Sequence, residues 1–370
     1  MTATTQPAAP DTTNDREPLL VVDDWKTYFK TAGGLLRAVD GVSLRVDAGS
    51  TIGLVGESGS GKTILSRSIL GLVRSRRKVE PGGTITYDGV VINKLSPKER
   101  RRYWGKDMAM VFQNPMTSLN PVLTIGRQLT EVLTLHLGMS KALARARAVE
   151  LLESVGIPEP KKRADEFPHQ LSGGMRQRVT IAIALSCNPR LLLADEPTTA
   201  LDVTVQAQIL DLLDEQQSAR DMTMILVTHD LGVVAGRTDT VAVMYAGKIV
   251  EIAPTKTLFT ETRHPYAEAL MRSIPTMDAP NHTRLFTIPG RPAQLTGEPK
   301  GCRFAPRCSY AQEKCLTEQP PLVAPERPDH SFACWFPVGT KPGQEALERN
   351  LSAGQTAAGT SMSLMTVLGA

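Results

Sequence analysis

The segment Gly56-Glu57-Ser58-Gly59-Ser60-Gly61-Lys62-Thr63 decides the fold of this chain. It has the form G-x-x-x-x-G-K-[ST], in which glycines let backbone N–H groups converge on phosphate oxygens at the start of a helix. Lys62 is placed to reach the β- and γ-phosphates, and the Thr63 hydroxyl is placed to bind Mg²⁺. The apolar run 51–55 before the loop is typical of a strand, and residues 64–71 after it have helical spacing. We therefore expect all eight residues to bind a nucleoside triphosphate.

Two adjacent acids follow a second apolar run, Leu191-Leu192-Leu193-Ala194, which is short enough to be a buried parallel strand. Asp195 at the end of this strand is a candidate ligand of Mg²⁺, held directly or through water. Glu196 is then the candidate general base that polarises the attacking water. An Asp-Glu pair at a strand end is often only a solvated turn, but its position downstream of a phosphate loop favours hydrolysis.

The order of further motifs resembles that of the ATP-binding-cassette ATPases over about residues 20–255. Leu171-Ser172-Gly173-Gly174-Met175 is similar to the signature motif, with Met175 where glutamine is commonest in that family. Gln113 matches the Q-loop glutamine, Ala200-Leu201-Asp202 the D-loop, and His229 the switch histidine. Tyr28 stands where the family stacks an aromatic ring on adenine.

This resemblance implies an α/β fold of the P-loop NTPase type, with a RecA-like core, an antiparallel β subdomain and an α-helical subdomain. It also implies that two cassettes pair head to tail around two ATP molecules. Each ATP is then held by the phosphate loop of one subunit and by Ser172, Gly173 and Gly174 of the other, with Asp202 at the same interface. His229 is expected to contact the γ-phosphate. Gln113 is expected to contact Mg²⁺ and to couple the nucleotide to rotation of the two lobes.

The chain divides into five parts by composition. Residues 1–17 are predicted to be a disordered tail, and residues 18–255 the nucleotide-binding domain. Within that domain we predict a helical subdomain over about 113–180, where one helix is marked by apolar residues near helical spacing and stops at Gly156. That apolar set is Ala142, Leu143, Ala146, Val149, Leu152 and Val155. Residues 256–336 form a predicted C-terminal module, and 337–370 a flexible tail.

Four of the five cysteines lie in that C-terminal module, at Cys302, Cys308, Cys315 and Cys334. So many cysteines in a short segment of a cytoplasmic protein argue against disulfides and for a metal site or an iron–sulfur cluster. Their wide, irregular spacing differs from the paired cysteines of a zinc ribbon and favours a bulkier cluster. Zinc and free thiols remain the alternatives. The fifth, Cys187, is expected to be a small core residue.

The module also resembles the tail of oligopeptide and dipeptide importer ATPases, through His264-Pro265-Tyr266, Ile288-Pro289-Gly290 and the segment 301–308. In that family the four cysteines are associated with a [4Fe–4S] cluster. The resemblance implies ATP-driven import of peptides, with a sister ATPase as heterodimer partner, two transmembrane permease subunits and an extracytoplasmic peptide-binding protein. Two alternatives are the ATPase of a nickel-chelate importer and a soluble ABC ATPase outside transport.

Composition limits the remaining possibilities. The chain has 370 residues, 41% of them hydrophobic, and contains no apolar stretch of the roughly 20 residues needed to span a bilayer. A charged start followed by an apolar block, the pattern of a secretory signal, is absent from residues 1–17. The net charge of +4 does not indicate a nucleic-acid partner. We therefore expect a peripheral protein at the cytoplasmic face of the cell membrane.

Overall fold

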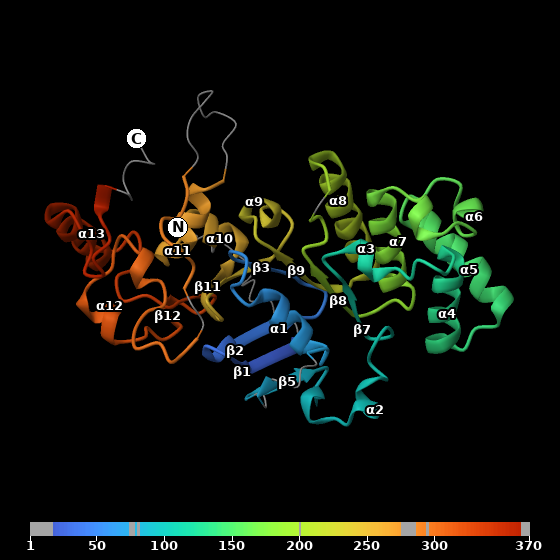
Figure 1. Cartoon of the computed structure of the whole chain (residues 1–370), viewed down its shortest axis with the longest axis horizontal. Helices are drawn as coiled ribbons and strands as arrows, with labels where there is room; N and C mark the ends of the chain where they lie inside the picture. The colour runs from blue at the N-terminus through green and yellow to red at the C-terminus, as the bar shows by residue number, and fades with distance from the viewer. Residues whose placement is uncertain are drawn as a thin grey trace, which may run out of the picture.

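Strand β3 (Thr51–Val55) lies inside the main sheet and leads directly into the phosphate loop (Figure 1). The structure, a computed structural model, describes residues 18–73, 78–79, 82–199, 201–274, 286–293 and 296–363. The main sheet has eight strands in the order β12-β13-β11-β10-β3-β9-β8-β7, and the five from β10 to β7 run parallel. Besides β3 these are β7 (Met108–Val111), β8 (Leu191–Asp195), β9 (Thr223–Thr228), β10 (Thr240–Tyr245), β11 (Lys248–Pro254), β12 (Val323–Arg327) and β13 (His330–Phe332).

The main sheet separates two hydrophobic layers. Because side chains alternate along a strand, Leu192 and Ala194 of β8 pack into one layer, and Leu191 and Leu193 into the other. All five residues of β8 are buried, which explains why its sequence reads as a continuous apolar run. The helices of this core are α1 (Lys62–Ile69), α8 (Val203–Arg220), α9 (Leu231–Val234) and α10 (Thr255–Thr260).

A second, antiparallel sheet lies beside the phosphate loop, in the order β2-β1-β5-β6 with β4 paired to β1. Its strands are β1 (Pro18–Thr31), β2 (Gly34–Asp47), β4 (Lys78–Val79), β5 (Thr84–Tyr87) and β6 (Val90–Val91), followed by the short helix α2 (Pro97–Arg100). This sheet is the antiparallel β subdomain that the family resemblance implies, and it lies next to the RecA-like core.

Helices fill the region between β7 and β8. They are α3 (Pro115–Ser118), α4 (Ile125–Leu137), α5 (Lys141–Ser154), α6 (Pro160–Arg163) and α7 (Gly173–Leu185). Helix α5 stops one residue before Val155, and Gly156 follows with φ 71°. The predicted apolar set is only partly buried: Leu152 and Val155 lie in the core, whereas Leu143 is 65% exposed and Ala144 and Ala148 are buried in its place. Alanines occur on two faces of this helix, so the sequence alone does not show which face is buried. Packing against α4 and α7 determines it.

The C-terminal module continues the main sheet, because β13 pairs with β11 of the cassette. It contains α11 (Pro265–Arg272), α12 (Glu313–Thr317) and α13 (Lys341–Ala353), and Figure 1 shows it at the opposite end of the molecule from α4–α6.

Helix α13 corrects the prediction of a flexible tail from residue 337. Thr340 caps the helix, and the buried Asn350 donates hydrogen bonds to the backbone oxygens of Ser309 and Ala311, 2.7 and 3.1 Å away. The buried Asn350, together with the fully buried Ala346, therefore anchors a segment whose composition suggests a flexible tail. The predicted tail 1–17 and D-loop residue Ala200 lie outside the described residues.

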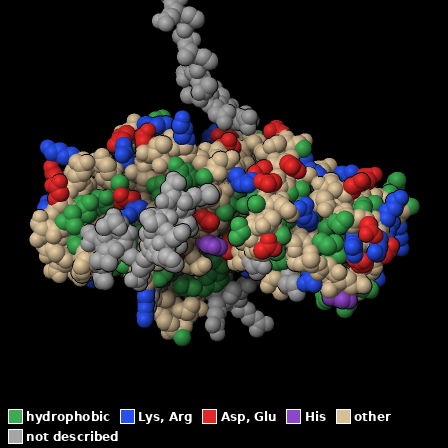
Figure 2. Space-filling view, turned by 90° about the horizontal axis from the view of Figure 1, so that it is seen from above, with side chains coloured by type: hydrophobic (Ala, Val, Ile, Leu, Met, Phe, Trp, Pro, Cys, Tyr) green, Lys and Arg blue, Asp and Glu red, His purple; other side chains and the backbone are tan. Residues whose placement is uncertain are grey.

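Surface charge is mixed rather than segregated. On the face shown in Figure 2, the coloured acidic and basic side chains are interspersed, with hydrophobic side chains between them. Such a face offers no continuous basic stripe among the residues drawn in colour.

Candidate functional site

The phosphate loop owes its shape to glycines. Gly61 has φ 107°, and a Cβ atom there would lie 2.2 Å from the backbone oxygen of Ala38. Gly56 has φ 156°, and a Cβ atom would lie 2.1 Å from the backbone oxygen of Met244. Both the backbone conformation and the space therefore require glycine at the two ends of the loop. Ser60, also in the loop, is 4% exposed, and its hydroxyl has no partner among the described residues.

Lys62 is the buried cation of this loop. Its ammonium donates hydrogen bonds to the backbone oxygens of Gly56, 2.6 Å away, and Glu57, 3.0 Å away. Burial lowers the pKa of Lys62, while the nearby carboxylates of Glu196, Asp195 and Glu57 act in the opposite direction. The ammonium is thus held across the loop, where it can exchange carbonyl oxygens for phosphate oxygens.

The side chains of Thr63, in α1, and Asp195, at the end of β8, are in contact, and both are predicted ligands of Mg²⁺. The Thr63 hydroxyl donates to Oδ1 of Asp195 at 3.0 Å, and Oδ2 of the fully buried Asp195 has no partner in the described part of the chain. Burial raises the pKa of Asp195. A buried carboxylate oxygen without a donor, next to a hydroxyl, fits a hard divalent cation that would neutralise charge on bound phosphates.

The carboxylate of Glu196 is contacted by the side chains of the two other predicted catalytic residues, Gln113 and His229. Gln113 donates its amide to Oε2 of Glu196 at 2.8 Å, and Nδ1 of His229 lies 3.5 Å from the same oxygen. Thr199 also donates to this oxygen, at 3.0 Å. The motif analysis did not single out Thr199, although its place three residues after Glu196 is a usable signal. Glu196 itself has φ 46°, a conformation that non-glycine residues rarely adopt and that clusters at functional sites.

The signature residues lie in the helical subdomain, at the start of α7. Ser172 caps this helix by accepting the backbone N–H of Met175, 3.3 Å away. A Cβ atom at Gly174 would lie 2.8 Å from Val205 of α8, so the signature packs closely against the helix that follows the D-loop. Asp202 caps α8 by accepting the backbone N–H of Val205 at 2.9 Å. The signature and the D-loop are therefore neighbours within one chain.

Tyr28 lies in strand β1 of the antiparallel sheet, paired with Arg37 of β2 on one side and with Val79 of β4 on the other. Its hydroxyl donates to Asp40, and the Arg37 guanidinium lies 5.2 Å from the centre of its ring. Burial and Asp40 together raise the pKa of Tyr28 to about 12. Adenine stacking on this ring stays a prediction, and any stacked base shares the ring with Arg37.

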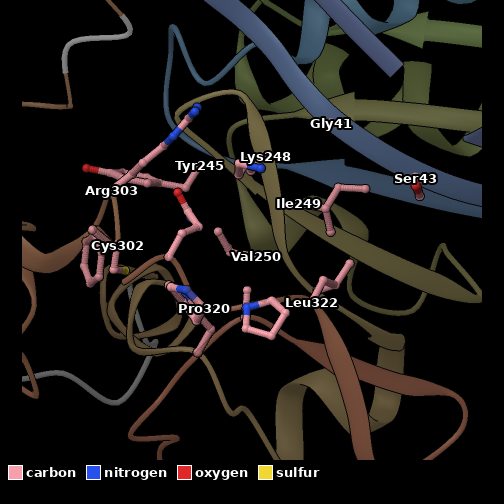
Figure 3. A pocket seen from close by; sticks show the side chains of 15 residues that line it. Gly41, Ser43, Tyr245, Lys248, Ile249, Val250, Cys302, Arg303, Pro320 and Leu322 are labelled. Carbon is pink, nitrogen blue, oxygen red and sulfur yellow. The ribbon is translucent and has the colours of Figure 1, made fainter. Parts of the chain in front are cut away.

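The C-terminal module reaches the nucleotide site, which sequence analysis missed. Arg303 donates to Asp40 and to the backbone of Ala246, and it lines a cavity between β11 and the module together with Lys248 (Figure 3). Arg307 donates to both carboxylate oxygens of Glu57 in the phosphate loop. The Arg303–Asp40 and Arg307–Glu57 pairs join residues 263 and 250 positions apart, and no local pattern in the sequence predicts them.

The four cysteines of the module converge on one small cavity. Burial raises the pKa of Cys302 to about 11 and also raises the pKa values of the other three thiols. Within the described ranges, no group of three or more His, Cys, Asp or Glu side chains is arranged to hold a single metal ion. The cavity is lined by Cys302, Cys308, Cys315 and Cys334 with Phe304, Pro320, Trp335 and Phe336.

Comparison with known proteins identifies both parts of the chain. Residues 39–199 match the family described as ABC transporter, and residues 250–315 match the oligopeptide/dipeptide transporter C-terminal region. The chain is 51% identical over 304 residues to the oligopeptide transport ATP-binding protein OppD of Bacillus subtilis (strain 168), covering 82% of this chain and 85% of that protein.

It is also 49% identical over 329 residues to the putative peptide import ATP-binding protein BMEII0863 of Brucella melitensis biotype 1, covering 86% and 97% of the two chains. A solved dimeric structure, a post-hydrolysis state of the ATP-binding cassette MJ0796 bound to ADP and Pi, matches with a TM-score of 0.58 and 29% identity. The match covers 64% of this chain and 98% of that one. The chain therefore belongs to the ABC transporter ATPases, among the ATP-binding proteins of oligopeptide and dipeptide transport.

Proposed function

We propose that this chain binds Mg²⁺ and ATP at the phosphate loop and uses hydrolysis to energise import of oligopeptides or dipeptides. The proposal depends on one observation: the side chains of Gln113 and His229 both lie against the carboxylate of Glu196. Glu196 directly follows Asp195, which accepts the Thr63 hydroxyl. Phosphoryl transfer depends mainly on positioning and charge neutralisation, and this arrangement supplies both.

Each side chain has a distinct role in this proposal. Lys62 and the loop backbone bind the phosphates, while Thr63, Asp195 and Gln113 hold Mg²⁺. Glu196 is the general base for the attacking water, and His229, whose side chain is 58% exposed, contacts the γ-phosphate. Tyr28 contributes an aromatic surface for adenine.

A second cassette completes the site. The signature residues Ser172, Gly173 and Gly174 lie at the start of α7, a helix of 13 residues whose terminal N–H groups suit an anion. They would face the ATP of a partner in a head-to-tail pair, with Asp202 beside them. The solved structure of the MJ0796 cassette bound to ADP and Pi is dimeric, which supports the pairing of two cassettes. We propose a heterodimer with a sister ATPase because of the form of the signature motif around Met175.

The remaining partners follow from transport. No helix among the described residues is long and apolar enough to cross a membrane. We propose that two permease subunits supply the channel, that an extracytoplasmic protein delivers the peptide, and that this chain works peripherally at the cytoplasmic face. The relatives named for oligopeptide transport and peptide import support peptides as cargo.

Uptake in cells that lack this protein tests the function. Wild-type protein is expected to restore entry of a labelled tripeptide, whereas the Glu196→Gln variant is not, because the importer would then bind ATP without completing its cycle. Nickel uptake is measured in parallel. If the protein restores only nickel entry, the cargo is nickel rather than peptide. If neither uptake depends on the protein, the proposed transport function is wrong.

We also propose a [4Fe–4S] cluster at Cys302, Cys308, Cys315 and Cys334. All four thiols line one cavity with apolar walls, and thiolate sulfur is the donor such a cluster requires. The raised thiol pKa values mean that the cysteines lose protons as the cluster binds.

Iron and sulfide analysis after anaerobic purification decides between cluster, zinc and free thiols. We expect about four iron atoms per wild-type chain, and a loss of most of this iron in Cys308→Ser. Cys187→Ser is the matched control, since Cys187 is as buried as Cys308, each being 7% exposed, but follows α7 in the cassette. Zinc without iron in the wild type, or full iron retention by Cys308→Ser, would reject the cluster.

A further inference from the structure

Arg307, in the segment 302–334 that carries the four cysteines, forms hydrogen bonds to Glu57 of the phosphate loop. Its guanidinium donates to Oε2 of Glu57 at 2.6 Å and to Oε1 at 2.9 Å, a bidentate pair in which the Arg307 side chain is only 3% exposed. Paired N–H···O bonds of this kind are among the strongest polar contacts in proteins and fix both partners in orientation.

The rest of the guanidinium is held just as firmly. Its Nε donates to the backbone oxygen of Pro289 at 2.9 Å, and Nη2 donates to that of Ile288 at 3.3 Å. Nη1 also lies 3.4 Å from the Tyr245 hydroxyl. Because every arm of the fork has a partner, the position of Arg307 is set by the module and by β10 rather than by Glu57 alone.

The backbone of Glu57 is anchored from the same side. Its N–H donates to the hydroxyl of Tyr266, a fully buried residue of α11, at 2.7 Å. The backbone oxygen of Glu57 accepts the Lys62 ammonium at 3.0 Å. Glu57 therefore connects the C-terminal module to the cation that is to bind the phosphates.

The charge of Glu57 creates a problem that Arg307 solves. A carboxylate in the second position of a phosphate loop repels the polyanionic triphosphate that the loop is shaped to bind, and repulsion is strong where water is partly excluded. The bidentate pair cancels this charge and draws the carboxylate towards the module. It also limits the motion of a loop whose glycines would otherwise make it costly to order.

We propose that Arg307 is a positioning residue for nucleotide binding: it neutralises the Glu57 carboxylate and fixes the phosphate loop from the C-terminal module. ATP affinity then depends on the packing of a module that lies outside the cassette. This inference rests on the proposed ATP site.

Equilibrium binding of a fluorescent ATP analogue to the full chain tests the proposal. Arg307→Met is expected to weaken binding about tenfold, because it leaves Glu57 unpaired at the loop. The double variant Arg307→Met/Glu57→Gln is expected to regain most of the lost affinity, since the uncompensated charge is gone. Arg327→Met, which removes an exposed arginine of the same module paired with Asp329, is expected to bind like the wild type.

The double variant separates positioning from folding. If Arg307→Met merely disrupts the module, neutralising Glu57 cannot restore binding, and a double variant as weak as the single one would overturn the proposal. Unchanged affinity in Arg307→Met would overturn it too. Failure of the wild-type chain to bind the analogue would instead reject the ATP site on which the inference rests.

Discussion

Glu196→Gln is expected to bind ATP with nearly wild-type affinity and to hydrolyse it at least about a hundredfold more slowly. The substitution keeps the size of the side chain and one oxygen acceptor for Gln113, Thr199 and His229, so the local structure should persist. It removes the carboxylate that can take a proton from the attacking water. Steady-state phosphate release and equilibrium ATP binding, measured on the same preparation, separate the two effects.

The matched control for this variant is Glu215→Gln, the same change at an exposed position of α8. It should leave both binding and turnover unchanged. If Glu196→Gln hydrolyses ATP at a near-normal rate, Glu196 is not the base, and the contacts of Gln113 and His229 need another explanation. If binding is lost together with turnover, Glu196 organises the site rather than accepting a proton.

Local chemistry explains why much of this site is readable in the sequence. A phosphate loop needs glycine where a side chain would strike the backbone, and Gly56 and Gly61 meet this condition at Met244 and Ala38. A buried parallel strand needs continuous apolar residues and presents its acids at its end, as β8 does with Asp195. Such requirements are satisfied within a few residues, so they leave a pattern in a single chain.

Contacts made between distant segments leave no such pattern. Nothing around Arg307 indicates that it pairs with Glu57, because an arginine between two cysteines reads as an ordinary surface residue. The Arg37 guanidinium over Tyr28 and the docking of α13 through Asn350 are similar cases. These features depend on how the C-terminal module packs on the cassette, which one sequence does not specify.

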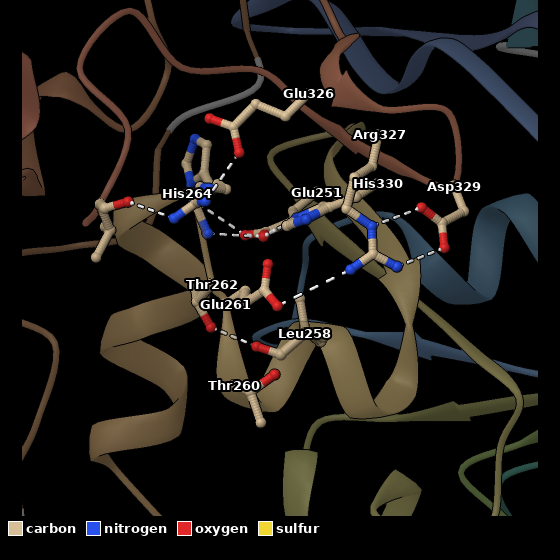
Figure 4. Close-up of polar contacts among 12 residues, drawn as sticks. Glu251, Leu258, Thr260, Glu261, Thr262, His264, Glu326, Arg327, Asp329 and His330 are labelled. Atoms are coloured by element: carbon tan, nitrogen blue, oxygen red, sulfur yellow. Dashed lines mark hydrogen bonds and ion pairs between the residues drawn. The ribbon is translucent and has the colours of Figure 1, made fainter. Parts of the chain in front are cut away.

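Glu251 is an intermediate case, because the sequence marks it as unusual without showing what it contacts. It is a single acid in the middle of the apolar strand β11, Lys248–Pro254, and such residues are almost never fully buried unless paired. The structure shows it fully buried, accepting the backbone N–H groups of Arg263 and His264 at 2.8 Å each (Figure 4). Nε2 of His330 lies 2.7 Å from Oε1. One carboxyl group thus joins the cassette to two segments of the module.

Glu251→Ala is expected to destabilise the attachment of the module by about 3–5 kcal/mol. The substitution leaves the N–H groups of Arg263 and His264 and the ring of His330 without their acceptor, and each unsatisfied buried donor costs about 1–3 kcal/mol. Hydrogen exchange resolved by peptide measures this locally, which suits a chain of several units that need not unfold in one step. Protection of residues 262–272 and 323–332 should fall about a hundredfold or more, while that of β3 and β8 should change little.

Glu326→Ala provides the control for this prediction, since Glu326 pairs with the side chain of the same Arg263 at 2.9 Å but is half exposed. An exposed ion pair contributes at most about 1 kcal/mol, so exchange in the same peptides should stay close to that of the wild type. The comparison separates the effect of a buried carboxylate with three partners from that of an exposed carboxylate with one. Equal effects of the two substitutions, or none from Glu251→Ala, would show that β13 pairing and apolar packing alone hold the module to the cassette.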